Sequence, residues 1–273
     1  DVLPKAADRV VYFLAPVLSV IPAFVAFAVI PLGPVVNMFG VQTPLQLTDM
    51  PVAVLFVLAI TSIGIYGIVI AGWSSNNKYS LLGGLRSSAQ MVSYEISMGM
   101  ATIPVLLLAG NVSLNQVVEH QAMIGPLSWH AATATLAWLI FLIAAFAETN
   151  RLPFDLPEAE SELVAGYQVE YSSTPYLLFM IGEYANIVFM CAMISLLFFG
   201  GWHPGFPTDF LNEWPEFLAN RFYVLVFCSK IVFWFVMIAT IPSFIVTWYA
   251  PFHIDDEEAR RMDVEAEGER ATG

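Results

Sequence analysis

The sequence predicts an all-α integral membrane protein, built as a bundle of about six transmembrane helices. Hydrophobic residues make up 58% of the 273 residues and charged residues only 12%, and the mean hydropathy is +0.70. An ordinary soluble domain carries about 25% charged residues. No long polar block could fold alone, so we expect one transmembrane domain over residues 1–250. Residues 251–273 are rich in acids and lack apolar periodicity, which predicts a disordered cytoplasmic tail.

The individual spans are predicted from apolar runs of roughly 20 residues, the length that a helix needs to cross a hydrocarbon core of about 30 Å. Pro16, Pro22 and Pro104 fall inside such runs, where transmembrane helices tolerate proline. The expected spans lie near residues 10–31, 51–73, 89–109, 129–147, 175–199 and 221–249.

The orientation follows from the basic residues, because Lys and Arg accumulate in the short cytoplasmic loops of membrane proteins. The loops 32–50, 110–128 and 200–220 contain neither residue. On the other side lie Lys5, Arg9, Lys78, Arg86, Arg151, Arg260, Arg261 and Arg270. We therefore expect both ends of the chain, and the loop 148–174, on the cytoplasmic side. We interpret Lys78 and Arg86 as positive anchors in a solvated connector after the second span.

Charge and cysteine content restrict the possible partners. The net charge of −13 disfavours nucleic acid. Cys191 and Cys228 lie in separate apolar runs, so the sequence supports neither a disulfide framework nor an iron–sulfur or zinc site. Any redox metal is expected on another chain.

The acidic loop is the strongest candidate for chemistry. Between two apolar runs it carries Glu148, Asp155, Glu158, Glu160, Glu162 and Glu170, with Arg151 as its basic residue. Asp155 and Glu158 fit the start of a helix, as a cap and its partner three residues later. Clustered carboxylates that lose solvent share protons near neutral pH. The loop is therefore either a solvated acidic face or a proton-handling cluster.

Two acids inside the predicted spans favour proton handling. Glu95 lies about 9 Å into the third span and Glu183 about two turns into the fifth, both on the cytoplasmic half. An intramembrane acid costs about 2.5 kcal/mol or more to insert and usually faces a bundle interior as a proton or ion relay. Lys230 is a possible counter-charge and relay residue. The alternative role for each acid is structural: an interhelical salt bridge, or a side chain that snorkels to the membrane interface. The four histidines are interpreted as surface residues: His120, His130, His203 and His253.

Several segments, in order along the chain, resemble one known family. They are G-W-S-S-N-N-K-Y-S-L-L-G at 72–83, R-x-S-A-Q-x-x-S-Y-E at 86–95, P-F-D-L-P-E-A-E-S-E-L-V-A-G-Y at 153–167, E-Y-S at 170–172, G-E-Y at 182–184 and F-F-G-G-W at 198–202. The chain resembles the membrane subunit that forms the quinone chamber of respiratory complex I, called the H subunit in bacteria. The resemblance runs from about residue 1 to residue 235.

The resemblance implies a quinone-binding, proton-coupling subunit of an NADH:quinone oxidoreductase that is not catalytic alone and has no catalytic residue of its own. It implies that Asp155, Glu158, Glu160, Glu162 and Glu170 line the route from the quinone cavity, and that Glu95, Glu148 and Glu183 continue it. Quinone would be the substrate, with no metal or flavin on this chain. Iron–sulfur clusters and FMN would lie on partner subunits, beside further small membrane subunits. The location would be the bacterial inner membrane.

The ends of the chain differ from the family, which has a further N-terminal span and, near its other end, an Arg-rich loop and a last span. Here Ile238 and Ser243 stand where arginines are expected, and the acidic tail follows. We expect an incomplete or diverged chain. Two alternatives remain: the homologous subunit of a membrane-bound hydrogenase or other ferredoxin- or F420-type oxidoreductase, and a cation/proton antiporter. An antiporter would show inverted repeats, which we do not find.

Overall fold

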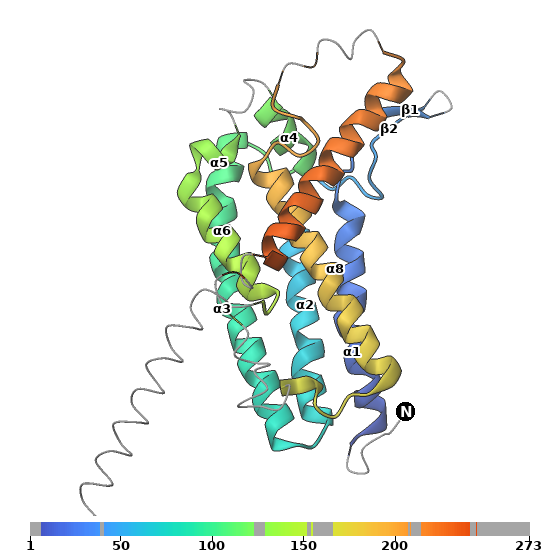
Figure 1. Cartoon of the computed structure of the whole chain (residues 1–273), viewed down its shortest axis with the longest axis vertical. Coiled ribbons are helices and arrows are strands. Elements are labelled where there is room, and N and C mark those ends of the chain that lie inside the picture. The colour runs from blue at the N-terminus through green and yellow to red at the C-terminus, as the bar shows by residue number, and fades with distance from the viewer. Residues whose placement is uncertain are drawn as a thin grey trace, which may run out of the picture.

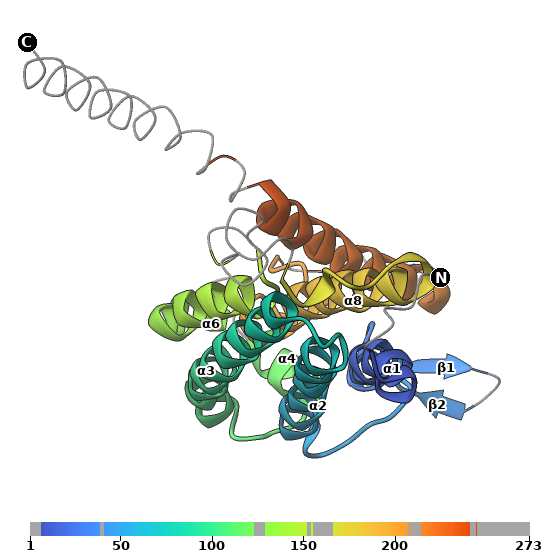
Figure 2. The same ribbon diagram turned by 90° about the horizontal axis from the view of Figure 1, so that it is seen from below.

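The computed structural model is a bundle of long helices that run up and down beside one another (Figures 1 and 2). It describes residues 7–38, 41–122, 129–151, 154, 166–206, 208, 214–240 and 244. Five helices are long and apolar enough to cross a membrane in these residues. The predicted fold class is confirmed. The tail 251–273 lies outside the described residues.

The first half of the chain forms three long helices. α1 spans Arg9–Ala26 and continues as a 3-10 turn, η1, Phe27–Val29; Asp8 begins α1 by accepting the backbone N–H of Val10 at 3.0 Å. A small antiparallel hairpin follows, β1 (Val36–Met38) with β2 (Val41–Thr43). α2 spans Ala53–Ser74 and α3 spans Lys78–Ala109.

α3 differs from the expectation at its start. Asn77 caps it by accepting the Tyr79 N–H at 3.0 Å, so the segment expected to be a solvated connector is the first part of a 32-residue helix. Lys78 and Arg86 therefore lie on α3, and not in a loop. Glu95 comes about 26 Å after Lys78 at 1.5 Å per residue, near the middle of the helix, instead of about 9 Å into it.

The fourth expected span is shorter than predicted. The chain passes through α4 (Leu114–Ala122) and one turn of helix, α5 (His130–Thr133), before α6, Thr135–Glu148. Ala134, with φ −123° and ψ 50°, separates α5 from α6. With 14 residues α6 is about 21 Å long, less than a hydrocarbon core of about 30 Å. Its lower end lies about halfway down the bundle (Figure 1).

The last part of the chain supplies the centre of the bundle. After a 3-10 turn, η3 (Gly166–Gln168), α8 spans Ser173–Phe198, and every residue from Phe189 to Phe198 is buried. A further helix, Glu216–Thr240, lies beside α8 (Figures 1 and 2). α1 packs against both α2 and α8, while α2 and α6 pack against α3. The bundle thus surrounds α8 with helices that are far apart in the sequence.

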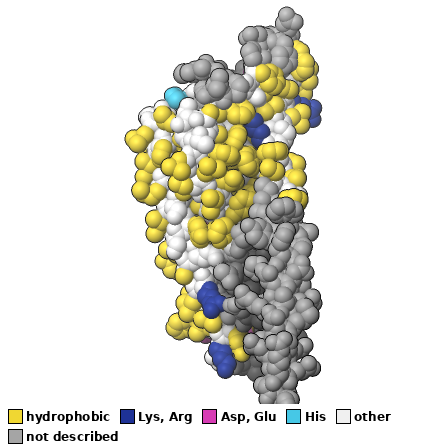
Figure 3. All heavy atoms as spheres, turned by 60° about the vertical axis from the view of Figure 1, so that its left-hand side comes forward, with side chains coloured by type: hydrophobic (Ala, Val, Ile, Leu, Met, Phe, Trp, Pro, Cys, Tyr) yellow, Lys and Arg dark blue, Asp and Glu magenta, His cyan; other side chains and the backbone are white. Residues whose placement is uncertain are grey.

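The surface of the bundle is apolar over its middle. Figure 3 shows one face on which hydrophobic side chains cover the central part, while Lys and Arg side chains lie toward the two ends. Large apolar residues such as Ile96, Leu107 and Leu136 are exposed. Such a surface is suited to contact with lipid, because apolar side chains are more stable against hydrocarbon chains than against water.

Candidate functional site

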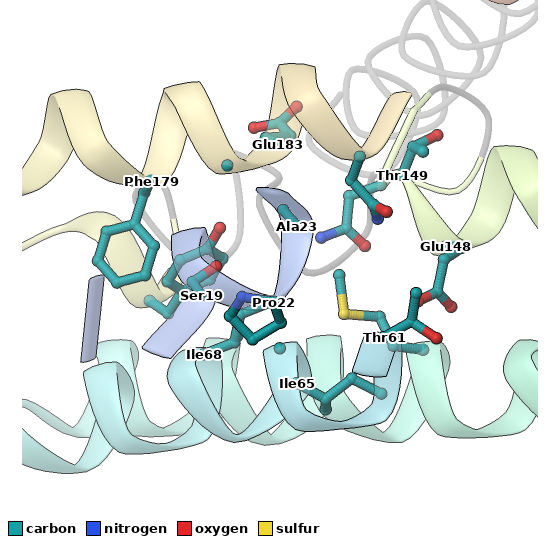
Figure 4. Close-up of a pocket in the computed structure, with 16 residues that line it drawn as sticks. Ser19, Pro22, Ala23, Thr61, Ile65, Ile68, Glu148, Thr149, Phe179 and Glu183 are labelled. Atoms are coloured by element: carbon teal, nitrogen blue, oxygen red, sulfur yellow. The ribbon is translucent and has the colours of Figure 1, made fainter. Parts of the chain in front are cut away.

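A cavity lies inside the bundle between α1, α2, α8 and the end of α6 (Figure 4). Its volume is about 60 Å³, enough for a few water molecules. Apolar side chains such as Ile65, Ile68 and Phe179 form part of its wall. The polar residues on the wall are Ser19, Thr61, Glu148, Thr149, Asn150, Glu183 and Asn186. The structure therefore brings two of the predicted acids, Glu148 and Glu183, to one cavity.

Glu148 is the most deeply buried of the predicted acids that the structure describes. It is the last residue of α6, only 2% exposed, and its Oε2 has no hydrogen-bond partner among the described residues. A buried charged carboxylate without partners is strongly unfavourable, so such a group gains from taking up a proton. The carboxyl group of Glu148 is thus suited to bind and release a proton rather than to hold a fixed charge.

Glu95 lies next to this site on α3. Its Oε1 accepts hydrogen bonds from Ser62 Oγ at 2.5 Å and from Thr61 Oγ1 at 3.2 Å, both on α2. Thr61 also lines the cavity, and Glu95 interacts electrostatically with Glu148. Two hydroxyl donors and a second carboxyl nearby form a short series of groups that can exchange protons.

Glu183 differs from Glu148 because it has a counter-charge. Arg151 Nη2 lies 2.9 Å from Glu183 Oε1, and the same guanidinium group lies over the ring of Tyr184, 5.2 Å from its centroid. The alternative predicted for the intramembrane acids, a salt bridge between elements, is therefore present at Glu183. Arg151 joins the segment after α6 to α8 across the cavity region.

Glu170 lies outside the cavity, at the end of the bundle where α3 begins. Its Oε1 accepts a hydrogen bond from Asn77 Nδ2 at 2.7 Å. Asp155, Glu158, Glu160 and Glu162, the central acids of the predicted cluster, lie outside the described residues. In the part of the chain that is described, no group of three or more His, Cys, Asp or Glu side chains could hold a metal ion.

One face of α3 contacts the acidic loop on both sides of its undescribed part, at Phe154 and at Gly166 and Tyr167. These contacts were not predicted from the sequence. Ser80 Oγ donates to the carbonyl oxygen of Tyr167 at 3.1 Å, and a Cβ on Gly83 would lie 2.6 Å from the Cα of Gly166. Further along, Gln90 Nε2 donates to the carbonyl oxygen of Phe154 at 2.9 Å. Tyr94 packs edge-on against the ring of Phe154.

The spacing of these residues is a signal that the sequence contains. Ser80, Gly83, Ser87, Gln90 and Tyr94 follow one another at alternating intervals of three and four residues, so they share one face of a helix. The signal could have been used only if the segment after the second span had been predicted as helix. In a connector without helical structure, the same spacing would place these residues on no common face.

Comparison with known proteins shows the family to which the chain belongs. A family model described as NADH dehydrogenase matches residues 1–250. The chain belongs to this family. It is 55% identical over 250 residues to the H subunit of the NADH-quinone oxidoreductase of Caulobacter vibrioides, an alignment that covers 87% of this chain and 67% of the relative.

Two further relatives are H subunits of the same kind of oxidoreductase. Identity to the protein of Maricaulis maris is 49% over 256 residues, covering 89% of this chain and 68% of the relative. Identity to the protein of Geobacter sulfurreducens, the H subunit numbered 1 in that organism, is 47% over 242 residues, covering 85% of this chain and 68% of the relative. The resemblance to this membrane subunit of complex I is confirmed.

Among the described residues, Lys230 contacts backbone carbonyl groups and does not pair with Glu95 or Glu183, the acids for which we expected it to be a counter-charge. Its Nζ donates to the carbonyl oxygens of Phe199, Gly201 and His203, at 2.7, 2.9 and 2.5 Å, and lies 4.8 Å from the centroid of the Trp129 ring. These carbonyl groups follow the end of α8, at the end of the bundle opposite Glu170. The lysine satisfies backbone groups that would otherwise lack donors.

His130 corrects a second expectation, because it is buried and not a surface residue. Its Nδ1 lies 2.9 Å from the Leu197 carbonyl oxygen, and its Nε2 lies 3.4 Å from His120 Nδ1. Gln121 Oε1 accepts the backbone N–H groups of both His130 and Gly200. This end of the bundle is a hydrogen-bonded structural junction. His253 lies outside the described residues.

Proposed function

We propose that this chain is a quinone-binding, proton-coupling membrane subunit of an NADH:quinone oxidoreductase. It would form part of the quinone chamber where the membrane domain meets the peripheral arm. Family membership supports the complex, since the relatives are named as subunits of NADH-quinone oxidoreductase. The observation that carries the proton-coupling role is the buried, unpartnered carboxyl oxygen of Glu148 on the wall of a cavity that Glu183 also lines.

The chemistry joins quinone reduction to these acids. Reduction of a quinone to a quinol takes up two electrons and two protons, so negative charge develops on the quinone oxygens until the protons arrive. Negative charge that develops nearby favours protonation of the buried carboxyl group of Glu148. Glu95 and Glu183 would continue the proton route. Asp155, Glu158, Glu160, Glu162 and Glu170 would form the part of the route nearest the quinone.

The remaining parts of the reaction would come from partner subunits. Iron–sulfur clusters and FMN on the peripheral arm would deliver the electrons. Neighbouring small membrane subunits would carry the protons onward. The complex would lie in a bacterial inner membrane, with the acidic loop and both ends of this chain on the cytoplasmic side.

Replacement of Glu148 tests this function. Glu148→Gln keeps the size of the side chain and removes the titrating group, so in the assembled complex we expect a loss of NADH:quinone reductase activity and of proton pumping on the order of tenfold or more. Electron transfer from NADH to an artificial acceptor that bypasses quinone should be unchanged. Glu119→Gln, an exposed acid on α4, is the matched control. Full pumping and quinone activity in Glu148→Gln would overturn the proposal.

A further inference from the structure

α6 ends inside the bundle, beside the middle of α3. Gln90, which receives this end, lies about 18 Å along α3 from Lys78 at 1.5 Å per residue. Ala147, Glu148, Thr149 and Asn150 are all buried, so the carbonyl groups at this end of α6 have little access to water. Each unsatisfied backbone group there costs several kcal/mol. The end of α6 therefore needs donors from the protein itself.

Some of these donors are local. Asn150 has φ 47°, in the left-handed region, which turns the chain so that the N–H of Arg151 donates to the Phe146 carbonyl oxygen at 3.2 Å. Thr149 Oγ1 donates to the Ala145 carbonyl oxygen at 3.0 Å. This one turn contains both Glu148, the acid that lines the cavity, and Arg151, the counter-charge of Glu183.

The other donor comes from α3, through a single amide group. Gln90 Nε2 lies 3.0 Å from the carbonyl oxygen of Ala147, 3.2 Å from Oδ1 of Asn150 and 2.9 Å from the carbonyl oxygen of Phe154. One turn earlier on the same face, Ser87 Oγ accepts a hydrogen bond from Asn150 Nδ2 at 3.2 Å. These bonds hold residues on both sides of Glu148 and Arg151 against α3.

We propose that Gln90 is a positioning residue for proton coupling: it fixes the turn after α6 so that Glu148 lines the cavity and Arg151 reaches Glu183. The inference rests on the proposed function, because it assigns to Gln90 the geometry on which that function depends. Gln90 does not line the cavity. It acts through the backbone beside Glu148 and through the side chain of Asn150.

The side chain at position 90 must donate hydrogen bonds, because all three of its partners are acceptors. Leucine fills a similar volume but leaves the Ala147 and Phe154 carbonyl groups without this donor. A charged glutamate would place acceptor oxygens against acceptor oxygens, which is repulsive. When protonated, the same glutamate regains one O–H donor. Gln90→Glu should therefore recover function as the pH falls, whereas Gln90→Leu should not.

The test compares three variants of the assembled complex, each with one substitution: Gln90→Leu, Gln90→Glu or Glu148→Gln. We expect Gln90→Leu to lower kcat for NADH:quinone reductase and proton pumping on the order of tenfold, since a small misplacement of reacting groups has a large effect on rate. Transfer to the bypassing acceptor should be unchanged. For Gln90→Glu, the ratio of mutant to wild-type activity should rise as the pH falls. Glu95, Glu148 and Arg151 are present in both proteins, so the ratio isolates the new carboxyl group.

The control is Gln121→Leu. Gln121 is also a buried glutamine, and its Nε2 donates a hydrogen bond to the Leu196 carbonyl oxygen at 2.9 Å. It lies away from the cavity, at the end of the bundle where α8 ends. It should lower thermal stability and leave kcat per assembled complex unchanged.

Each result has one meaning. Normal activity in both Gln90 variants, with Glu148→Gln impaired, would overturn the positioning role alone. Normal activity in Glu148→Gln would overturn the proposed function. If Gln90→Leu does not assemble, the pH profile of Gln90→Glu decides, and a flat ratio overturns the inference.

Discussion

The rings of Tyr12 and Tyr171 stack in parallel, with centroids 4.2 Å apart and an angle of 4° between their planes. The pair joins the start of α1 to the segment before α8. Tyr12 Oη donates to the Glu170 carbonyl oxygen at 2.9 Å, and Tyr171 Oη donates to the Tyr12 carbonyl oxygen at 3.2 Å. Burial raises the pKa of Tyr171 to about 12, so its phenol stays neutral and can donate over the physiological range.

Truncation of Tyr171 should therefore destabilise the chain in two steps. Tyr171→Phe removes the hydroxyl that bonds Tyr12 and contacts Ser74 at 3.1 Å, and should cost about 1 kcal/mol. Tyr171→Ala also removes the stacked ring and its edge contact with Phe179, and should cost about 3–5 kcal/mol. The midpoint of thermal unfolding of the purified complex measures both. Equal midpoints for the two variants would show that ring packing contributes nothing here.

Lys230 should act on stability rather than on proton transfer. Lys230→Met keeps much of the volume but removes the donor for three carbonyl groups after α8, and should cost on the order of 3 kcal/mol. Lys230→Arg should retain a large part of the stability, because it keeps charged donors. Thermal unfolding and pumping per assembled complex are measured together. A Lys230→Met complex of normal stability that does not pump would restore the relay role predicted from the sequence.

Much of the architecture could be predicted from apolar run lengths alone. The runs at 51–73 and 175–199 became α2 and α8 nearly residue for residue, because a hydrocarbon core fixes the length of a span. The polar first part of α3 could not be predicted in this way. Its Ser, Gly and Gln residues bind other parts of the chain instead of lipid, so hydropathy does not mark it as helix.

The acids of the site could be predicted from the sequence, but the residues that hydrogen-bond the backbone around them could not. Glu95, Glu148 and Glu183 were found because a carboxyl group in an apolar run is rare and costly. Gln90 and Asn150 were missed, since a neutral amide in an apolar run has no equally clear meaning. The partner of Lys230 was predicted wrongly for a physical reason. Opposite charge suggested an acid, but backbone carbonyl groups at the end of a helix also attract a cation.

His203 should make stability depend on pH. Burial, with the nearby positive charge of Lys230, lowers the pKa of His203 below its usual value. The unfolded chain therefore binds this proton more readily than the folded chain. The contribution of His203 to stability is complete above its unfolded pKa of about 6.5, and falls as the pH drops from there through the lower folded pKa.

Replacement of the imidazole by a group that does not titrate tests this sign. In His203→Gln, the decline of the thermal midpoint between about pH 6.5 and pH 5 should be shallower than in the wild type. The comparison is made at constant ionic strength, because salt screens the neighbouring Lys230 charge. A parallel decline in both proteins would show that His203 does not titrate in this range.

The orientation of the bundle is the last prediction. Ser172 lies directly before α8, at the end of the bundle where α1 and α3 begin, and Asn111 follows the end of α3 at the opposite end (Figure 1). Arg9 begins α1 and Lys78 begins α3, so basic residues lie at the Ser172 end of the bundle, and that end should be cytoplasmic. The native thiols are first removed as Cys191→Ala and Cys228→Ala, since Cys228 is exposed. In this background Ser172→Cys should react with an impermeant maleimide only in inside-out vesicles, and Asn111→Cys only in right-side-out cells. Reaction of both from one side would overturn the arrangement of the helix ends, whereas the reverse pattern would keep the fold and invert its orientation.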